Sequence, residues 1–394
     1  MKNHRQLGTE LKLFFFHDAA PYGPFWLPKG LVIFNELEKY LRALYVRENI
    51  QEISTPTMVR KELWERSGHW EKFSDNMYNF KDEKLDVALK PMNCPESALV
   101  YEADVRSYRD LPLRFAEIGR LHRKEVSGAV GGLFRVRQMT MDDLHVYCRP
   151  DQLQDELGAI LRNINDFHKL FSFTGEYFLA TKPDTSLGTK EQWDLAEKAL
   201  ADALDGQKIK YTVKPKEGAF YGPKVDINVK DSQGRDWTIS TVQVDFQIPE
   251  RFGLVYTDEH GKASQPVIIH RAVFGTFERF IGILLEHTQG VFPVWITPVQ
   301  VKILTVADEY IGSARKLADQ LTSNQIRVEL DDSNESVGKK IRNAELEKIP
   351  YIVVFGEKEQ KYGKLAVRER GSKEVKQLII DKLIDTIRNM EPEC

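Results

Sequence analysis

Arginine and glutamate side chains that could bind a nucleotide lie close together in the sequence. Arg123 and Glu125 flank Lys124, so on an extended strand both side chains point to the same face, and Arg135 and Arg137 follow on the expected return strand. A guanidinium and a carboxylate in this arrangement could bind a phosphate and an exocyclic amine. The alternative is cross-strand ion pairing on a solvated face, which an isolated Arg-x-Glu pattern favours.

Common nucleotide-binding signatures are absent from the sequence. It contains no glycine loop ending in Gly-Lys-Ser/Thr, no dinucleotide fingerprint and no kinase catalytic loop. Any ATP site must therefore use other side chains, such as these arginines.

The arginines belong to an expected long hairpin. Residues 113–125 and 134–147 are strand-like, and the glycine-rich segment 126–132 joins them. Further strands are expected at residues 224–229, 237–246 and 267–270, and apolar residues at helical spacing predict helices at 30–45 and 277–286. The larger part of the chain thus has an α+β pattern around an antiparallel sheet.

The C-terminal part has a different pattern. Pro293 and Pro298 bracket a short apolar stretch, which is the clearest break in the chain. Beyond it, strand-like runs at 299–307, 326–330 and 351–355 alternate with helical stretches at 310–323 and 337–348. We therefore expect an α/β fold of two domains, residues 1–296 and a small α/β domain at 297–394.

Composition limits the class of protein. Hydrophobic residues make up 42% and charged residues 29% of the chain, and no apolar run approaches the ~18 residues that span a bilayer. The N-terminus lacks the pattern of a secretory signal, so we expect a cytoplasmic protein without membrane contact. The chain has only three cysteines, a small and odd number, which argues against a disulfide framework. The net charge of -3 means that a nucleic-acid partner would need local basic patches.

Three segments in this order resemble the motifs of class II aminoacyl-tRNA synthetases: residues 54–56, 123–125 and 275–279. The resemblance implies an antiparallel sheet flanked by helices, with Pro56 at a homodimer interface. It also implies that Arg123 contacts the α-phosphate of ATP, that Glu125 contacts adenine, and that Arg279 and Arg135 contact the γ-phosphate. Arg123 and Arg279 are then the catalytic residues, with Mg²⁺ bound alongside ATP.

Six further segments are similar to the threonyl-tRNA synthetases: residues 25–30, 63–70, 90–95, 107–114, 218–224 and 269–272. This resemblance implies a threonine--tRNA ligase, which activates L-threonine with ATP and transfers it to the 3′ end of tRNA(Thr). The second domain then resembles the anticodon-binding domain of that family. Asn334, Glu359 and Arg368 match positions that contact anticodon bases in that family.

The family also implies a metal. Cys94, His145 and His270 match its zinc ligands, a set of one thiolate and two imidazoles with one open position, and one Zn²⁺ per subunit is expected. Spacing alone would not predict this site, because a lone cysteine or histidine is more often part of a core. Zinc would bind the amino group and hydroxyl of threonine together, so valine would leave the metal unsatisfied.

Other matching positions surround the expected substrate. Asp143 matches an aspartate that binds threonine, Tyr221 and Lys224 match substrate contacts, and Gln243 matches an ATP contact. Some positions depart from the bacterial pattern: Met141 and Thr238 replace glutamines, and Glu96 and Ser97 replace Gly-His.

Two alternatives remain beside this interpretation. A synthetase-like paralogue could bind tRNA or an amino acid for regulation without catalysis. Among enzymes, the Cys94, His145 and His270 set argues against prolyl and histidyl synthetases. Full-length threonyl enzymes carry an N-terminal editing domain, whereas the catalytic region here begins near Met1. We therefore expect no editing domain in the chain and a separate protein that clears seryl-tRNA, unless the organism tolerates it.

Overall fold

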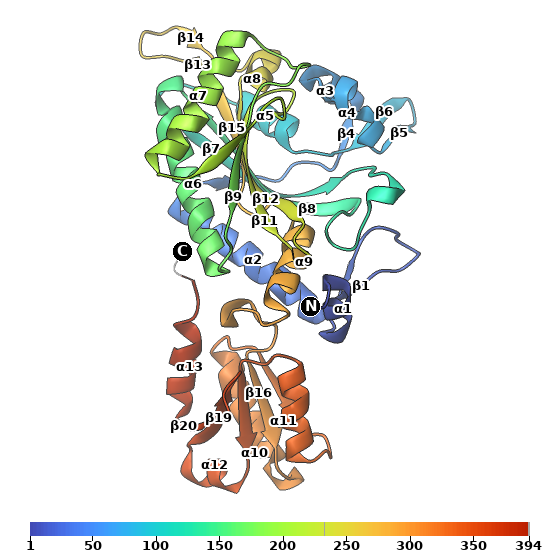
Figure 1. The fold of residues 1–394 in the computed structure, drawn as a ribbon, viewed down its shortest axis with the longest axis vertical. Coiled ribbons are helices and arrows are strands. Elements are labelled where there is room, and N and C mark those ends of the chain that lie inside the picture. The colour runs from blue at the N-terminus through green and yellow to red at the C-terminus, as the bar shows by residue number, and fades with distance from the viewer. Residues whose placement is uncertain (232, 393–394) are drawn as a thin grey trace. The chain divides into compact units, whose positions relative to one another are not determined.

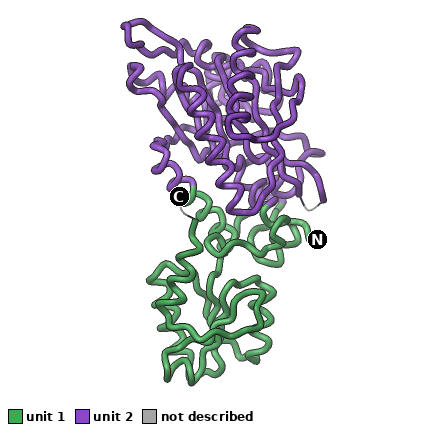
Figure 2. The backbone as a smooth tube through the Cα atoms, turned by 60° about the vertical axis from the view of Figure 1, so that its left-hand side comes forward, with its two compact units in different colours: residues 1–17, 25–40, 284–394 green, residues 18–24, 41–283 purple. Residues whose placement is uncertain are grey.

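Two compact units make up the chain in a computed structural model that describes residues 1–231 and 233–392. Unit 1 contains residues 1–17, 25–40 and 284–394, and unit 2 contains residues 18–24 and 41–283 (Figure 2). Cys394 lies outside the described residues. The domain boundary expected after residue 296 stays a prediction, since the units are not divided at a single point of the chain.

A large sheet forms the centre of unit 2. Its strands are β3 (Gln51–Glu52), β7 (Leu113–His122), β8 (Gln138–Cys148), β9 (Glu176–Ala180), β10 (Tyr211–Lys214), β11 (Lys224–Lys230), β12 (Asp236–Asp245) and β15 (Val267–Ala272). They lie in the order β10-β9-β11-β12-β15-β8-β7-β3. Figure 1 labels the strands β7, β8, β9, β11, β12 and β15 of this sheet. The central strands from β9 to β7 pair antiparallel, and only the edge strands β10 and β3 pair parallel. The expected antiparallel sheet is thus confirmed.

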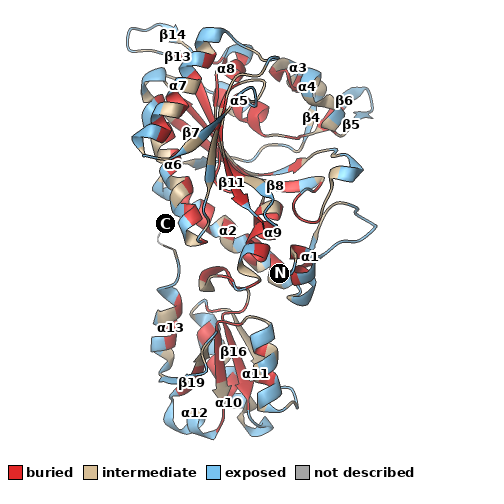
Figure 3. Ribbon diagram, in the orientation of Figure 1, coloured by how far each residue is buried: buried red, intermediate tan, exposed pale blue. Residues whose placement is uncertain are grey.

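Helices pack against this sheet. They include α5 (Cys94–Glu102), α6 (Leu153–Leu170), α7 (Lys190–Gly206) and α8 (Gln247–Phe252). In α6, Leu157, Ile160, Leu161 and Ile164 are buried at helical spacing, which gives the helix one apolar face. Thr189 and Gln192 form a capping box that starts α7. Buried residues lie both on the strands of the sheet and on the helices that cover it (Figure 3).

Smaller elements complete unit 2. A second sheet, in the order β4-β6-β5, contains β4 (Met58–Arg60), β5 (Asn79–Asp82) and β6 (Leu85–Leu89). The remaining elements are α3 (Lys61–Ser67), α4 (His69–Phe73), β13 (Tyr256–Thr257) and β14 (Ala263–Ser264). Two helices contain residues of both units, α2 (Pro28–Arg47) and α9 (Phe277–Thr288).

Unit 1 contains a five-stranded sheet. Its strands are β16 (Val301–Thr305), β17 (Val328–Asp331), β18 (Tyr351–Phe355), β19 (Leu365–Glu369) and β20 (Val375–Leu378), in the order β17-β16-β18-β19-β20. The first three are parallel, as strand-helix alternation predicts. The helices of this fold are α10 (Ile311–Ser323), α11 (Val337–Leu346), α12 (Glu357–Tyr362) and α13 (Ile380–Arg388). The expected small α/β fold is confirmed. Unit 1 also includes α1 (His4–Glu10), β1 (Phe14–Phe15) and β2 (Phe25–Trp26).

The hairpin is shorter than expected. Strand β7 ends at His122 and β8 begins at Gln138, so Arg123, Glu125, Arg135 and Arg137 all lie outside the regular strands. The expectation that Arg123 and Glu125 alternate along a strand was wrong. The reason lies in the main chain, because the Lys124 nitrogen donates to the Asn76 carbonyl at 2.8 Å and the Arg137 nitrogen to the Tyr22 carbonyl at 3.0 Å. These bonds to other segments replace the ladder between the two strands.

Among residues 1–231 and 233–392, no helix is both long and apolar enough to cross a membrane.

A cluster of phenylalanine rings stabilises the packing of unit 2. The ring of Phe280 in α9 has its centre 5.2 Å from Phe167, 5.2 Å from Phe171 and 4.9 Å from Phe274. Phe280→Ala should lower the free energy of unfolding by about 3 to 5 kcal/mol, because it removes a buried ring and leaves a cavity. Urea unfolding measures this. The exposed Leu195→Ala should change stability by less than about 0.5 kcal/mol, and an equally small effect of Phe280→Ala would contradict the packing.

Candidate functional site

The three expected metal ligands meet in unit 2. Cys94 is the first residue of α5, His145 lies on β8, and His270 lies on β15. The two histidines are direct partners across the sheet, and their ring centres lie 4.8 Å apart. One potential ligand atom from each of the three residues lies within 4.8 Å of the other two, and all three side chains are buried.

The chemistry of these side chains fits a metal ion. Among the described residues, the Nε2 atom of His145 is buried without a hydrogen-bond partner, and Oδ1 of Asp143 lies 4.0 Å from it. Burial lowers the pKa of His145, which keeps the imidazole neutral, as a ligand must be. Burial also raises the pKa of the Cys94 thiol, so its thiolate form requires a nearby cation. One thiolate and two neutral imidazoles are the donors that a catalytic zinc site uses.

Carboxylates lie beside both histidines, and one of them is within hydrogen-bond distance of His270. The Nε2 atom of His270 lies 3.1 Å from Oδ2 of Asp245, whose Oδ1 accepts hydrogen bonds from the main-chain nitrogens of Gln247 and Ile248. Asp143 accepts a hydrogen bond from Nδ2 of Asn93 at 3.0 Å. Such partners fix the orientation of ligand rings in metal sites. Sequence reasoning missed Asp245 and Asn93.

A row of polar side chains crosses the sheet beside the histidines. Lys224 on β11 pairs with Gln243 on β12, Gln243 pairs with His270, and His270 pairs with His145. Directly opposed residues of a sheet project to the same face, so these expected contacts share one surface. The Tyr221 hydroxyl donates to Oε1 of Gln243, and its ring centre lies 5.6 Å from that of His270. Lys224 forms an ion pair with Asp226 at 2.6 Å.

The arginines form a region of positive charge. Nε of Arg123 donates to the Pro91 carbonyl at 3.1 Å, and Nε of Arg279 donates to the Phe134 carbonyl at 2.9 Å. Burial, together with the positive charges of Arg123 and Arg135, lowers the pKa of Arg279 to about 10. A bound polyanion would stabilise the charge of Arg279, which the other two guanidinium groups destabilise.

Glu125 lies beside these arginines. Its Oε2 atom is 3.9 Å from Nη1 of Arg135, and Arg135 is exposed. This weak contact leaves the Glu125 carboxylate able to accept another donor. The neighbouring Arg137 makes different contacts. Its Nε atom donates to the Glu125 carbonyl, and its Cζ atom lies 4.3 Å from the centre of the Tyr22 ring.

Buried carboxylates hold the start of α9, which bears Arg279. Oδ2 of Asp142 accepts hydrogen bonds from the main-chain nitrogens of Val273 and Phe274, at 2.6 and 3.3 Å. The Glu278 carboxylate accepts one from the Thr140 nitrogen at 3.0 Å. Sequence reasoning missed both, since a buried carboxylate with main-chain partners has no local sequence signature.

His69 was also missed. It is buried, its Nδ1 atom lies 2.9 Å from the Ser67 hydroxyl, and its Nε2 atom has no hydrogen-bond partner among the described residues. Burial lowers its pKa to about 4, and Asp245 and His270 are close enough to influence it. The signal was present, because His69 lies in segment 63–70, which resembles the threonyl enzymes.

Pro56 is exposed and follows a buried ion pair. Nζ of Lys90 lies 2.8 Å from Oε1 of Glu117, and Thr55 donates to the same carboxylate from its nitrogen at 2.9 Å. This network fixes the segment before Pro56, whereas the interface role of Pro56 stays a prediction.

Three of the four residues that differ from the bacterial pattern make a polar or main-chain contact, and the side chain of the fourth, Glu96, has no hydrogen-bond partner in the described part of the chain. Thr238 donates to Oδ1 of Asn228 at 2.7 Å, Met141 forms a β-bridge with Thr276, and Ser97 lies 2.9 Å from the Tyr147 hydroxyl. Glu96 is buried, and among the described residues neither carboxylate oxygen has a partner. Burial raises its pKa to about 8, so it is largely protonated at neutral pH.

The expected anticodon contacts lie in unit 1. Asn334 is exposed between β17 and α11, and Glu359 lies in α12, just after β18. Both therefore follow the carboxyl ends of parallel strands, where open α/β sheets bind ligands. Arg368 lies on β19 opposite Ile352, away from that edge, and forms an ion pair with Glu345 at 2.8 Å.

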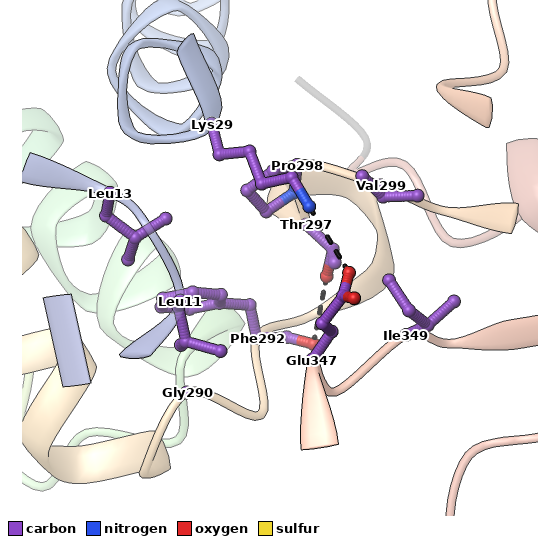
Figure 4. Close-up of a pocket in the computed structure, with 10 residues that line it drawn as sticks. All are labelled: Leu11, Leu13, Lys29, Gly290, Phe292, Thr297, Pro298, Val299, Glu347 and Ile349. Carbon is purple, nitrogen blue, oxygen red and sulfur yellow. Dashed lines mark hydrogen bonds and ion pairs between the residues drawn. The ribbon is translucent and has the colours of Figure 1, made fainter. Parts of the chain in front are cut away.

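A cavity in unit 1 is too small to be a substrate site. It has a volume of about 30 Å³ and is lined by Lys29, Glu347 and apolar side chains that include Leu11 and Phe292 (Figure 4). That space is comparable to one water molecule. This cavity therefore adds no substrate site to the polar face of the large sheet in unit 2.

Comparison with known proteins agrees with this geometry. Residues 78–288 match the family model described as tRNA synthetase class II core domain (G, H, P, S and T), and residues 294–390 match the one described as anticodon binding domain. Threonine--tRNA ligases of Desulforamulus reducens and Thermotoga neapolitana are 47% and 46% identical over 98% of this chain. The chain spans only 62% and 61% of their lengths.

Solved structures give the same assignment. A crystal structure described as the RNA binding domain of threonyl-tRNA synthetase from Cryptosporidium parvum matches with a TM-score of 0.97 and 38% identity, over 100% of this chain and 99% of that one. Prolyl-tRNA synthetase from Cryptosporidium parvum shares the fold at a TM-score of 0.74 and 16% identity, over 98% of this chain and 74% of that one. The chain therefore belongs to the class II aminoacyl-tRNA synthetases and, among them, to the threonyl-tRNA synthetase family.

Proposed function

We propose that this chain acts as a threonine--tRNA ligase. It would activate L-threonine with ATP to threonyl-adenylate and then transfer the threonyl group to the 3′ end of tRNA(Thr). The observation that carries the proposal is the meeting of Cys94, His145 and His270 beside a polar row on the sheet. A thiolate and two imidazoles suit a metal that reads an amine and a hydroxyl on one small molecule.

Cys94, His145 and His270 would hold one Zn²⁺, which supplies a Lewis-acid position for the amino group and hydroxyl of threonine. Asp143 lies beside His145 and would accept a hydrogen bond from the amino group of threonine. Tyr221 and Lys224 would line the substrate pocket. Their hydrogen bonds and ion pairs, to Gln243 and Asp226, hold them in position before substrate binds.

The arginines would act on ATP. In the activation step, a carboxylate oxygen of threonine forms a bond to the α-phosphorus, and the bond from that phosphorus to pyrophosphate breaks. Arg123 would stabilise charge on the α-phosphate, and Arg279 and Arg135 would hold the γ-phosphate, with Mg²⁺ bound to the triphosphate. The Glu125 carboxylate would accept a hydrogen bond from the exocyclic amine of adenine. Gln243 would be a further contact to ATP.

Partners follow from the same proposal. Asn334, Glu359 and Arg368 would contact anticodon bases, since amides, carboxylates and guanidinium groups suit the reading of unstacked bases. Pro56 would lie at a homodimer interface. The cytoplasmic location and a separate protein that clears seryl-tRNA remain predictions from the sequence.

A non-catalytic paralogue is the alternative function. It would be favoured by loss of an arginine or a ligand, whereas Arg123, Arg279 and the Cys94, His145 and His270 set are all present. The geometry therefore favours catalysis.

Amino-acid-dependent pyrophosphate exchange tests the proposal. Threonine should support the fastest exchange, and serine, which lacks only a methyl group, should be slower by about 10- to 200-fold in kcat/KM. Valine and proline should support none that is measurable, because neither carries the hydroxyl that the site reads. Exchange with proline alone would assign the chain to another specificity, and exchange with no amino acid would favour the paralogue.

Substitution of Arg123 tests the role of the positive region. Arg123→Ala should lower the rate of threonine activation about a hundredfold or more, since it removes one preorganised group that stabilises developing charge. Zinc content should not change. The matched control is Arg120→Ala, which removes an exposed arginine from β7 and should retain the rate. Equal exchange rates in both variants would show that Arg123 has no catalytic role.

A further inference from the structure

A buried lysine lies in the small α/β fold of unit 1. Lys340 in α11 is only 2% exposed. Its Nζ atom donates to the Thr305 carbonyl at 3.0 Å and to the Asp331 carbonyl at 3.2 Å, and it lies 3.4 Å from the Thr305 hydroxyl. Thr305 ends β16 and Asp331 ends β17. One ammonium group therefore joins the carboxyl ends of two parallel strands.

A short chain of hydrogen bonds leads from this lysine to an expected anticodon contact. Oδ1 of Asp331 lies 4.0 Å from Nζ of Lys340 and accepts hydrogen bonds from the Ser333 hydroxyl at 2.6 Å and the Ser333 nitrogen at 3.1 Å. Ser333 precedes Asn334. Burial raises the pKa of Asp331, but the hydrogen bonds from Ser333, followed by the positive charges of Lys340 and Lys302, outweigh it and lower the pKa, which keeps the carboxylate charged and accepting.

The other end of the segment is also held by α11. Nδ2 of Asn343 donates to Oε2 of Glu335 at 3.0 Å, and Nζ of Lys339 lies 2.6 Å from Oε1 of the same carboxylate. Asn334 is thus exposed between two residues that are both tied to one helix. Because these contacts hold the segment before a base binds, it loses less conformational freedom on binding than an unconstrained segment would.

We propose that Lys340 is a positioning residue for base recognition, which holds residues 331–334 in the conformation in which Asn334 reads a base of single-stranded RNA. The inference rests on the proposed function in that it takes the RNA to be tRNA(Thr). Lys340 acts through Asp331 and Ser333, because a side chain with 2% exposure cannot itself contact a base or a phosphate. Its partners are main-chain carbonyls, so removal of the ammonium group leaves buried acceptors unsatisfied and loosens the segment.

The test compares Lys340→Met with a matched control in the same sheet. Lys302→Met also removes a buried lysine, whose ion-pair partners Glu329 and Glu347 lie outside the 331–334 segment. The charge of Lys302 also acts on Asp331, though less than that of Lys340, so this variant controls for the loss of a nearby positive charge. Filter binding would give the dissociation constant of each variant for a tRNA(Thr) transcript and for a transcript with one anticodon base changed. Lys340→Met should weaken binding of the first transcript by about tenfold or more, the effect of losing one charged hydrogen bond. It should also reduce the preference for the first transcript over the second, whereas Lys302→Met should preserve that preference.

The outcomes separate this inference from the proposed function. An unchanged preference in Lys340→Met would overturn the positioning role, as would an equal loss in Lys302→Met. If Lys340→Met does not fold, Ser333→Ala decides, because it removes one exposed hydroxyl from the same chain of bonds. It should weaken binding about threefold, within the range for one hydrogen bond, and no change would overturn the inference. Threonine-dependent pyrophosphate exchange should be the same in all variants, and its absence in the unsubstituted protein would count against the proposed function alone.

Discussion

The antiparallel pairing of β8 with β15 is the constraint that brings the two histidines of the candidate site together. It sets His145 directly opposite His270, and the next pairing, with β12, sets Gln243 opposite His270. Side chains alternate between the two faces of a strand, so a shift of one residue would move a histidine to the other face of the sheet. The register is held by buried apolar neighbours such as Val146 and Ile269, which cannot be exposed without a large cost. The alignment of the polar side chains across the sheet thus depends on the packing of apolar residues that would not contact the substrate.

Buried polar networks extend this constraint to the arginines. Asp142 follows Met141 on β8 and binds the main chain at Val273 and Phe274, so the strand that carries His145 also fixes the start of the helix that carries Arg279. A carboxylate in such a place is stable only with its partners in position. The proposed metal ligands and the proposed anion-binding arginines are therefore connected through buried polar contacts, and the ion pair of Lys90 with Glu117 lies next to the segment before Pro56.

The sequence predicted the elements better than it predicted the site. Apolar runs such as residues 351–355 predicted β18, because a strand covered on both sides has a local signature. Cys94, His145 and His270 could not be joined by spacing, since only the register of distant strands brings them together. A family resemblance supplied that set. The tip of the hairpin was predicted wrongly because Lys124 and Arg137 make main-chain bonds to Asn76 and Tyr22, which no local pattern reveals. His69 and Asp245 were missed because their roles depend on burial beside the same histidines.

In the proposed function, the amino acid binds at a metal held by Cys94, His145 and His270. Visible absorption of the protein loaded with cobalt(II) in place of zinc tests this most directly, because the spectrum reports the ligands of the ion. The expected bands are those of a tetrahedral site with one thiolate, which change when threonine is added and stay the same when valine is added. A spectrum that does not respond to threonine, or that is unchanged in His145→Ala, would show that the amino acid does not bind at a metal held by these three residues.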